Sequence, residues 1–157
     1  MKLEIKELTT DDFIYIDTLT NWLYNWWGID ENYTKESIKC MLEHTINKND
    51  LPKTYIMLDN NTLVGMYQFL YDDLDIRPDL YPWLSNVYID PTFRGKGYSK
   101  VLLNSVYNNA LKSNLKELYL YTTHTNFYEK FNFTYLGTID TFKTKDRIQR
   151  LYNIKIK

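Results

Sequence analysis

The chain has 157 residues, about the size of one typical domain, and it is 44% hydrophobic and 17% aromatic, which excludes an intrinsically disordered chain. Its net charge of -1 excludes a charge-driven binder of nucleic acid, and no stretch approaches the roughly 18 consecutive apolar residues of a membrane span. A single cysteine, Cys40, and two histidines exclude a disulfide and a cysteine-based zinc site. We therefore expect a soluble, cytoplasmic protein without a bound metal, as a monomer or a homodimer.

The N-terminal segment predicts a strand and then a helix. Leu3 and Ile5 alternate with charged residues, as in a half-buried strand. A helix is predicted to begin at Thr9 or Thr10 and to continue to Gly28, because apolar residues recur at spacings of three and four. These residues are Phe13, Ile16, Leu19, Leu23 and Trp26.

A second helix is predicted to begin after the cap Thr34 and to end before Pro52. Cys40 falls on the apolar side of this helix, which favours a core position over a role as a nucleophile. The predicted apolar stripe consists of Ile38, Met41, Leu42, Thr45 and Ile46.

The middle of the chain predicts a hairpin, an acidic loop and another strand. Two β-rich runs within residues 54–73 are joined by Asp59, Asn60 and Asn61, and asparagine tolerates the positive φ of tight turns. The segment at 71–82 is predicted to be an irregular loop, and WLSNVYI at 83–89 predicts the next strand. The loop carries the four aspartates Asp72, Asp73, Asp75 and Asp79.

The C-terminal part alternates helix and strand. Apolar periodicity predicts a helix over 96–113, a central strand over 117–122, a short helix over 126–131, and strands over 133–136 and 152–156. This order of elements predicts a single α/β domain with a mixed central sheet flanked by helices.

Two of the five glycines stand in the segment RGKGYS at 94–99, between the strand that ends at Ile89 and a helix. A helix start offers unpaired N–H groups, and glycines let a phosphate approach the backbone, so the segment predicts an anion site. It lacks both GxxxxGK[ST] and GxGxxG, so neither a Walker loop nor a dinucleotide fingerprint is present. A plain strand-to-helix turn is the alternative interpretation.

RGKGYS resembles the coenzyme-A loop of the GNAT acetyltransferase superfamily, (Q/R)xxGx(G/A), with Ser99 at the last position. RPDLYPWLSNVYIDP and FYEKFNF also resemble family segments, and the order of elements agrees from Lys2 to Lys157. The resemblance implies an N-acetyltransferase domain over residues 1–157, with a mixed, mostly antiparallel sheet and acetyl-CoA as co-substrate.

The resemblance also implies cofactor contacts. The pantetheine arm is expected along the strand at 83–89, paired with the main chain of Val87 and Ile89, where an N–H polarises the thioester carbonyl. The family's pantetheine-binding asparagine is replaced by Tyr121, and Asn126 either takes that role or caps the short helix. The pyrophosphate is expected on the backbone N–H groups of Arg94, Gly95, Lys96, Gly97, Tyr98 and Ser99.

Tyr128, in FYEKFNF, stands at the family's general-acid position and is expected to protonate the departing thiolate, although packing is its alternative role. Ser85 occupies the position of the glutamate base of the histone-acetylating branch. We therefore predict a proton relay through Ser85, Asn86 or a nearby carboxylate, with Asp73, Asp75 and His124 as weaker candidates.

The acceptor is expected to bind between the N-terminal helices and the acidic loop. Trp22 or Trp27 is a candidate for stacking on a cation or a ring, whereas Leu23 and Trp26 are assigned to the core. Asp73 and Asp75 are candidates for attracting a cationic amine.

These features predict an N-acetyltransferase that transfers acetyl from acetyl-CoA to a primary amine of a small molecule or peptide, by direct attack in a ternary complex. One alternative is a non-catalytic acyl-CoA-binding or regulatory module, which the substitution at Ser85 keeps open. Another is an interaction domain that uses the tryptophan-rich helix. No nucleic-acid or membrane partner is expected.

Overall fold

The computed structural model describes residues 2–46, 49–143 and 145–157. Seven strands form one sheet in the order β1-β2-β3-β4-β5-β7-β6, in which every neighbouring pair is antiparallel except β4 and β5. This arrangement confirms the predicted mixed, mostly antiparallel sheet. The strands are β1 (Leu3–Glu7), β2 (Lys53–Asp59), β3 (Thr62–Leu70), β4 (Trp83–Ile89), β5 (Glu117–Thr122), β6 (Thr134–Asp140) and β7 (Ile148–Lys155).

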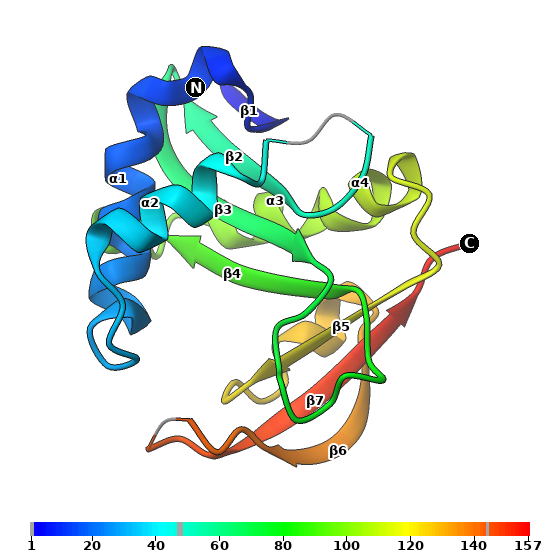
Figure 1. Ribbon diagram of the computed structural model, residues 1–157. Coiled ribbons are helices and arrows are strands. Elements are labelled where there is room, and N and C mark those ends of the chain that lie inside the picture. Colours follow the sequence, from blue (N-terminus) through cyan, green and yellow to red (C-terminus); the bar gives the residue numbers. More distant parts are fainter. Residues whose placement is uncertain (1, 47–48, 144) are drawn as a thin grey trace.

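The sheet opens between its two parallel strands. β4 and β5 pair only at Trp83 and Tyr119, beside a hydrogen bond from Tyr119 N–H to Pro82 O of 2.9 Å. Beyond that point the two strands diverge, so Figure 1 shows one half of the sheet made of β1 to β4 and another made of β5 to β7. Among the described residues, no strand pairs with the β5-facing edge of β4 from Leu84 onward.

Helices cover both faces of the first half. Successive residues of a strand point to opposite faces, and β2 follows this rule: Tyr55 and Met57 join one core cluster, whereas Ile56 and Leu58 join another. The first cluster includes α3 (Tyr98–Asn104) and α4 (Val106–Lys112), and the second includes α1 (Ile16–Leu23) and α2 (Lys35–Glu43). None of the helices among residues 2–46, 49–143 and 145–157 is long and apolar enough to cross a membrane.

The predicted first helix consists of three consecutive helical segments. Thr9 begins it with a capping box completed by Asp12, and a 3₁₀ helix η1 (Thr10–Tyr15), α1 and a π-helical turn η2 (Tyr24–Gly28) follow. In η2 the N–H of Ile29 donates to Tyr24 O, five residues back, at 3.0 Å. A π turn shifts the helical periodicity, so the core assignment of Trp26 is wrong: its side chain is 46% exposed.

The second helix begins where predicted, because Thr34 caps it through a hydrogen bond from Ser37 N–H. It ends at Glu43, and Ile38 and Leu42 are buried in the core. Cys40 is exposed, which corrects its predicted core position. Its Sγ lies 3.7 Å from His44 Nδ1, on the solvent side of the helix.

The C-terminal elements agree with the predicted order and differ in length. The predicted short helix is a single 3₁₀ turn, η4 (Tyr128–Phe131), which ends at the left-handed residue Asn132 (φ 68°). In β5, Leu118 and Leu120 enter the core, while Tyr119 and Tyr121 pack against Trp83 on the other face. The last two strands, β6 and β7, are longer than predicted and form a hairpin.

Candidate active site

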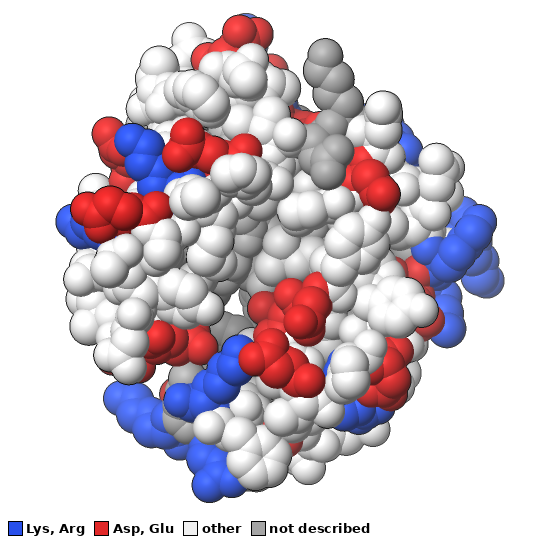
Figure 2. Space-filling view, viewed as in Figure 1, with Lys and Arg blue, Asp and Glu red and all other residues white. Residues whose placement is uncertain are grey.

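An open pocket of about 1070 Å³ lies where β4 separates from β5. Its walls come from the N-terminal helices, the loop after β3, the facing parts of β4 and β5, and the segment between β6 and β7. Figure 2 shows this face of the molecule hollowed near its centre, with acidic and basic side chains around the hollow. The sheet therefore provides the cavity by opening.

A β-bulge shapes the floor of the pocket. Met66 pairs with Tyr88 and Gln68 pairs with Ser85, so two residues of β4, Asn86 and Val87, lie opposite a single residue of β3. Asn86 adopts a positive φ of 51°, which asparagine tolerates better than most residues.

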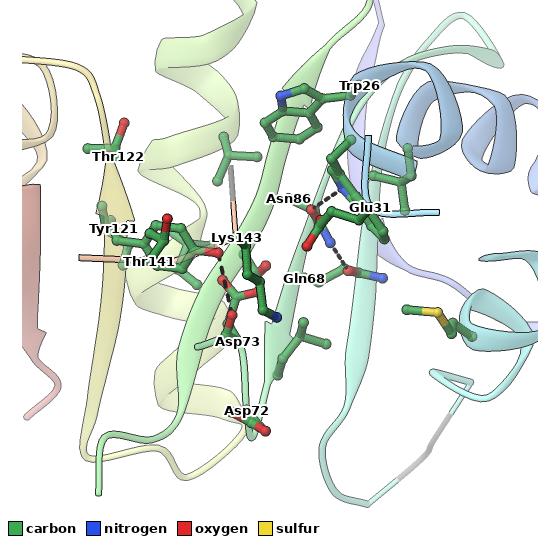
Figure 3. Close-up of a pocket in the computed structure, with 18 of the residues that line it drawn as sticks. Trp26, Glu31, Gln68, Asp72, Asp73, Asn86, Tyr121, Thr122, Thr141 and Lys143 are labelled. Carbon is green, nitrogen blue, oxygen red and sulfur yellow. Dashed lines mark hydrogen bonds between the residues drawn. The ribbon is translucent and has the colours of Figure 1, made fainter. Parts of the chain in front are cut away.

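Side-chain hydrogen bonds hold the bulge in place. Trp27 Nε1 donates to Asn86 Oδ1 at 3.0 Å, and Asn86 Nδ2 donates to Gln68 Oε1 at 2.6 Å (Figure 3). Gln68 Nε2 donates to Thr54 Oγ1 at 2.9 Å, which extends the chain into the core. Trp27, Gln68 and Asn86 all line the pocket, and the network fixes their orientations.

The glycine-rich loop follows β4 after a single 3₁₀ turn, η3 (Pro91–Phe93). Gly95 and Gly97 have φ of 78° and 83°, and a Cβ at either position would have no atom within 4 Å. The loop is therefore open on the side that a ligand would approach, and both positions need the freedom of glycine. Arg94 Nε donates to Ile89 O at 2.8 Å, which ties the loop to the strand.

The side chains around Gly97 have distinct roles. Lys96 lies 5.6 Å above the Phe93 ring and is exposed to solvent. Tyr98 begins α3 and is buried, with its hydroxyl bonded to the Asp59 carboxylate, so its side chain anchors the helix while its backbone faces the loop. Ser99 is half-buried in the first turn.

Tyr128 lines the pocket and is 7% exposed. Its ring packs against Phe127, Phe133 and Tyr152. Burial raises the pKa of its phenol above the usual value, so the hydroxyl is protonated at neutral pH. Within the described chain this hydroxyl has no hydrogen-bond partner, which leaves its proton available to a ligand.

Asp73 lies beside Ser85 in the pocket wall. Ser85 is 5% exposed on β4, and Asp73 comes from the loop after β3. Burial raises the pKa of the Asp73 carboxyl to about 6, against the opposing effects of the Ser85 hydroxyl and the Lys143 ammonium. The Tyr121 hydroxyl donates to Asp73 O at 3.4 Å, which fixes this part of the loop (Figure 3).

The tryptophans that line the pocket are not all the ones that the sequence predicts. Trp27 and Trp26 line the pocket, and Leu23 is buried at 2% exposed as predicted, with part of its side chain also at the pocket wall. Trp22 does not line it: its ring packs against Tyr88, and its Nε1 donates to Asp90 Oδ2 at 3.2 Å. Trp22 is therefore a packing residue, because the π turn comes after it and changes only the later positions.

A family model described as the acetyltransferase (GNAT) family matches residues 11–133. The chain belongs to the GNAT acetyltransferase family. None of the curated proteins compared with it matches its sequence.

Solved GNAT structures share this fold at low sequence identity. An aminoglycoside 6'-N-acetyltransferase complexed with coenzyme A is 16% identical with a TM-score of 0.74, over 98% of this chain and 97% of that one. A spermidine N-acetyltransferase from Vibrio cholerae, in complex with coenzyme A and spermine, is 20% identical with a TM-score of 0.71, over 98% and 95%. A ribosomal L7/L12 alpha-N-protein acetyltransferase in complex with coenzyme A is 13% identical with a TM-score of 0.74, over 99% and 95%.

The structure also gives the positions of three further candidates of this GNAT chain. Asn126 is exposed with a φ of 57°, and it lies outside the pocket lining. It does not cap η4, because the cap residue is Phe127 and no side chain caps the turn. Asp75 and His124 line the pocket, and Asp75 forms an ion pair with Lys143.

Sequence reasoning missed several residues of the pocket. Gln68 carried a signal, because a polar side chain inside an otherwise apolar central strand must find partners. The sequence gives no comparable signal for Glu31, Thr141 and Lys143, because they come from irregular segments that only the tertiary structure brings to the pocket. The described residues contain no group of three or more His, Cys, Asp or Glu side chains that could hold a metal ion.

Proposed function

We propose that the protein transfers the acetyl group of acetyl-CoA to a primary amine by direct attack in a ternary complex. The observation that carries the proposal is that one pocket, opened by the separation of β4 and β5, contains both an unpaired tyrosine hydroxyl and a carboxyl with a pKa of about 6. β4 leads from this pocket, through the 3₁₀ turn η3, to the glycine-rich loop.

The residues present fit coenzyme A. The open space over Gly95 and Gly97 fits a pyrophosphate held by backbone N–H groups. The free edge of β4 fits an extended pantetheine arm, which would add to the sheet as a strand at Val87 and Ile89. When bound, acetyl-CoA supplies an acyl group on a thiolate leaving group.

Asp73 and Tyr128 divide the proton transfers. The Asp73 carboxylate takes a proton from the ammonium form of the acceptor, directly or through a water held at Ser85, and so frees the amine lone pair for attack. The N–C bond forms and the C–S bond breaks, with Tyr128 giving its proton to the sulfur. The nitrogen gives up its second proton, directly or through water, to the tyrosinate, which restores the phenol. A carboxyl with a pKa near neutrality is suited to this role because it is largely ionised at pH 7 and still basic.

The charges of the pocket favour a cationic acceptor. Two lysines, Lys143 and Lys145, face six carboxyl side chains among the lining residues. A protonated amine gains from such a field before it is deprotonated. Among the solved GNAT structures, the aminoglycoside and spermidine enzymes are named for amine acceptors of small size. The six carboxyl residues are Asp30, Glu31, Asp72, Asp73, Asp75 and Asp146.

Cofactor binding is tested by thermal denaturation. Acetyl-CoA should raise the Tm of the wild type, because a ligand that binds only the folded state stabilises it. Gly97→Trp should abolish the rise by filling the open side of the loop, whereas Gly97→Ala, with the same positive φ and no bulk, should retain most of it. An unchanged Tm of the wild type would refute the cofactor assignment.

Turnover is tested by the release of free thiol with a panel of aminoglycosides, polyamines, amino acids and peptide N-termini. A non-catalytic acyl-CoA-binding module, which the absence of a glutamate at Ser85 favours, would show the rise in Tm and release no thiol with any amine. Thiol release with one amine class would identify the acceptor and exclude that alternative.

A further inference from the structure

Three segments far apart in the sequence bring their charges together at the mouth of the pocket. Lys143, from the segment between β6 and β7, places its Nζ 3.2 Å from Asp75 Oδ2 on the loop after β3. Glu31, after η2, and Tyr33 also attract this ammonium. The ammonium in turn favours the ionised form of the Asp73 carboxyl. Figure 3 shows Lys143 reaching toward Asp73 in the pocket.

A buried hydroxyl in the same wall has no partner. Thr141 is 3% exposed and lines the pocket, and in the part of the chain that the structure describes its Oγ1 makes no hydrogen bond. An unpaired buried hydroxyl costs free energy that a ligand can recover by bonding to it. The wall of the pocket that carries the acidic mouth therefore also contains an independent polar group whose hydrogen bond is unmade.

We propose that Lys143 occupies the position of a second cationic group of the acceptor, so that the preferred acceptor is a diamine or polyamine. This proposal rests on the proposed function, since it assigns the second ammonium to Asp75 and Glu31 while the reacting nitrogen lies at Asp73. The ammonium of Lys143 marks the site because it has the charge, size and hydrogen-bonding capacity of an alkylammonium ion.

Displacement of Lys143 is easy. Its side chain is 39% exposed and that of Asp75 is 71% exposed. An exposed ion pair of this kind changes an equilibrium constant by roughly five-fold at most. An incoming ammonium can therefore replace Lys143, and the lysine then turns to solvent without leaving a buried charge unpaired.

The test compares butane-1,4-diamine with butan-1-amine by calorimetric titration into the protein at pH 7, where both nitrogens of the diamine are protonated. The wild type should bind the diamine more tightly. Lys143→Met should raise the diamine-to-monoamine affinity ratio roughly two- to five-fold by removing the competing ammonium. Asp75→Asn should lower the ratio toward one.

Lys39→Met is the matched control, because Lys39 forms a similar exposed ion pair with Asp17 at 3.3 Å and does not line this pocket. This variant should leave the ratio unchanged. Equal affinities for the two amines in the wild type, or an equal change of the ratio in the Lys143 and Lys39 variants, would overturn the proposal. If a monoamine supported thiol release as well as the diamine does, the diamine preference would be refuted and acetyl transfer would stand. If the protein bound the diamine preferentially and released no thiol, acetyl transfer would be refuted and the diamine site would stand.

Discussion

Asp73→Asn should stabilise the protein and remove most of its activity. The carboxyl has a pKa of about 6 in the folded chain, compared with the ordinary 3.8, because burial disfavours its charged form. At pH 7 this difference corresponds to about 3 kcal/mol of folding free energy that is lost when the group ionises. An amide of the same shape carries no charge and avoids this cost.

The pH dependence has a definite sign. A carboxyl whose pKa is raised on folding binds its proton more tightly in the folded state, so its contribution to stability is complete below about pH 4 and is lost as pH rises through 6. The wild type should therefore lose stability between these values relative to Asp73→Asn. The gain of the variant should reach up to about 3 kcal/mol at pH 7 and vanish near pH 4.

Activity should change in the opposite direction. Removal of a general base costs about 10²- to 10⁴-fold in rate, and the wild-type kcat should fall tenfold per pH unit below pH 6 as Asp73 takes up a proton. Urea denaturation at pH 4 and pH 7 and thiol release from pH 5 to 8 measure both effects. Asp72→Asn, at the exposed neighbour, is the control for charge alone. If Asp73→Asn were as active as the wild type, or differed from it in stability by the same amount at pH 4 and pH 7, the role assigned to Asp73 would be refuted.

Three further predictions concern the same pocket. Tyr128→Phe should lower kcat by about 10²-fold or more without changing acetyl-CoA affinity, since only a proton donor is lost; equal rates would exclude Tyr128 as the acid. Gln68→Leu should lower the free energy of unfolding in urea by about 1–3 kcal/mol and lower kcat, because Asn86 loses its hydrogen-bond acceptor at the bulge. An unchanged kcat would show that the bulge does not contribute to catalysis. Lys143→Met should move the acid limb of the kcat profile to higher pH by about half a unit, because a cation that favours ionised Asp73 is removed; high salt should abolish the shift.

The fold was predictable because its signals are local. Alternating or helical periodicity identified the elements, and the cap at Thr34 was read correctly from the sequence. The loop 94–99 was recognisable for the same reason, since two scarce glycines sit between a strand and a helix. Trp26 was misassigned because a π turn, which leaves no clear sequence signal, interrupts the helical period before it.

The chemistry of the pocket was less predictable because it depends on non-local contacts. Asp73 was one of four aspartates in a loop, and nothing in the sequence distinguishes it from its exposed neighbour Asp72. Its raised pKa arises only when the loop folds against β4 beside Ser85. Lys143 was indistinguishable from any surface lysine until the β6–β7 segment placed it opposite Asp75.

The distribution of buried polar groups argues that the pocket is a built site. Burying a polar side chain costs free energy unless its hydrogen bonds are satisfied. In the described chain, five of the nine buried polar or charged residues line the cavity where the sheet opens. These residues are Thr45, Gln68, Ser85, Thr122 and Thr141. Thr45, Gln68 and Thr122 have hydrogen-bond partners within the chain, whereas the Thr141 hydroxyl has none among the described residues, so an apolar side chain at that position would avoid a free-energy cost.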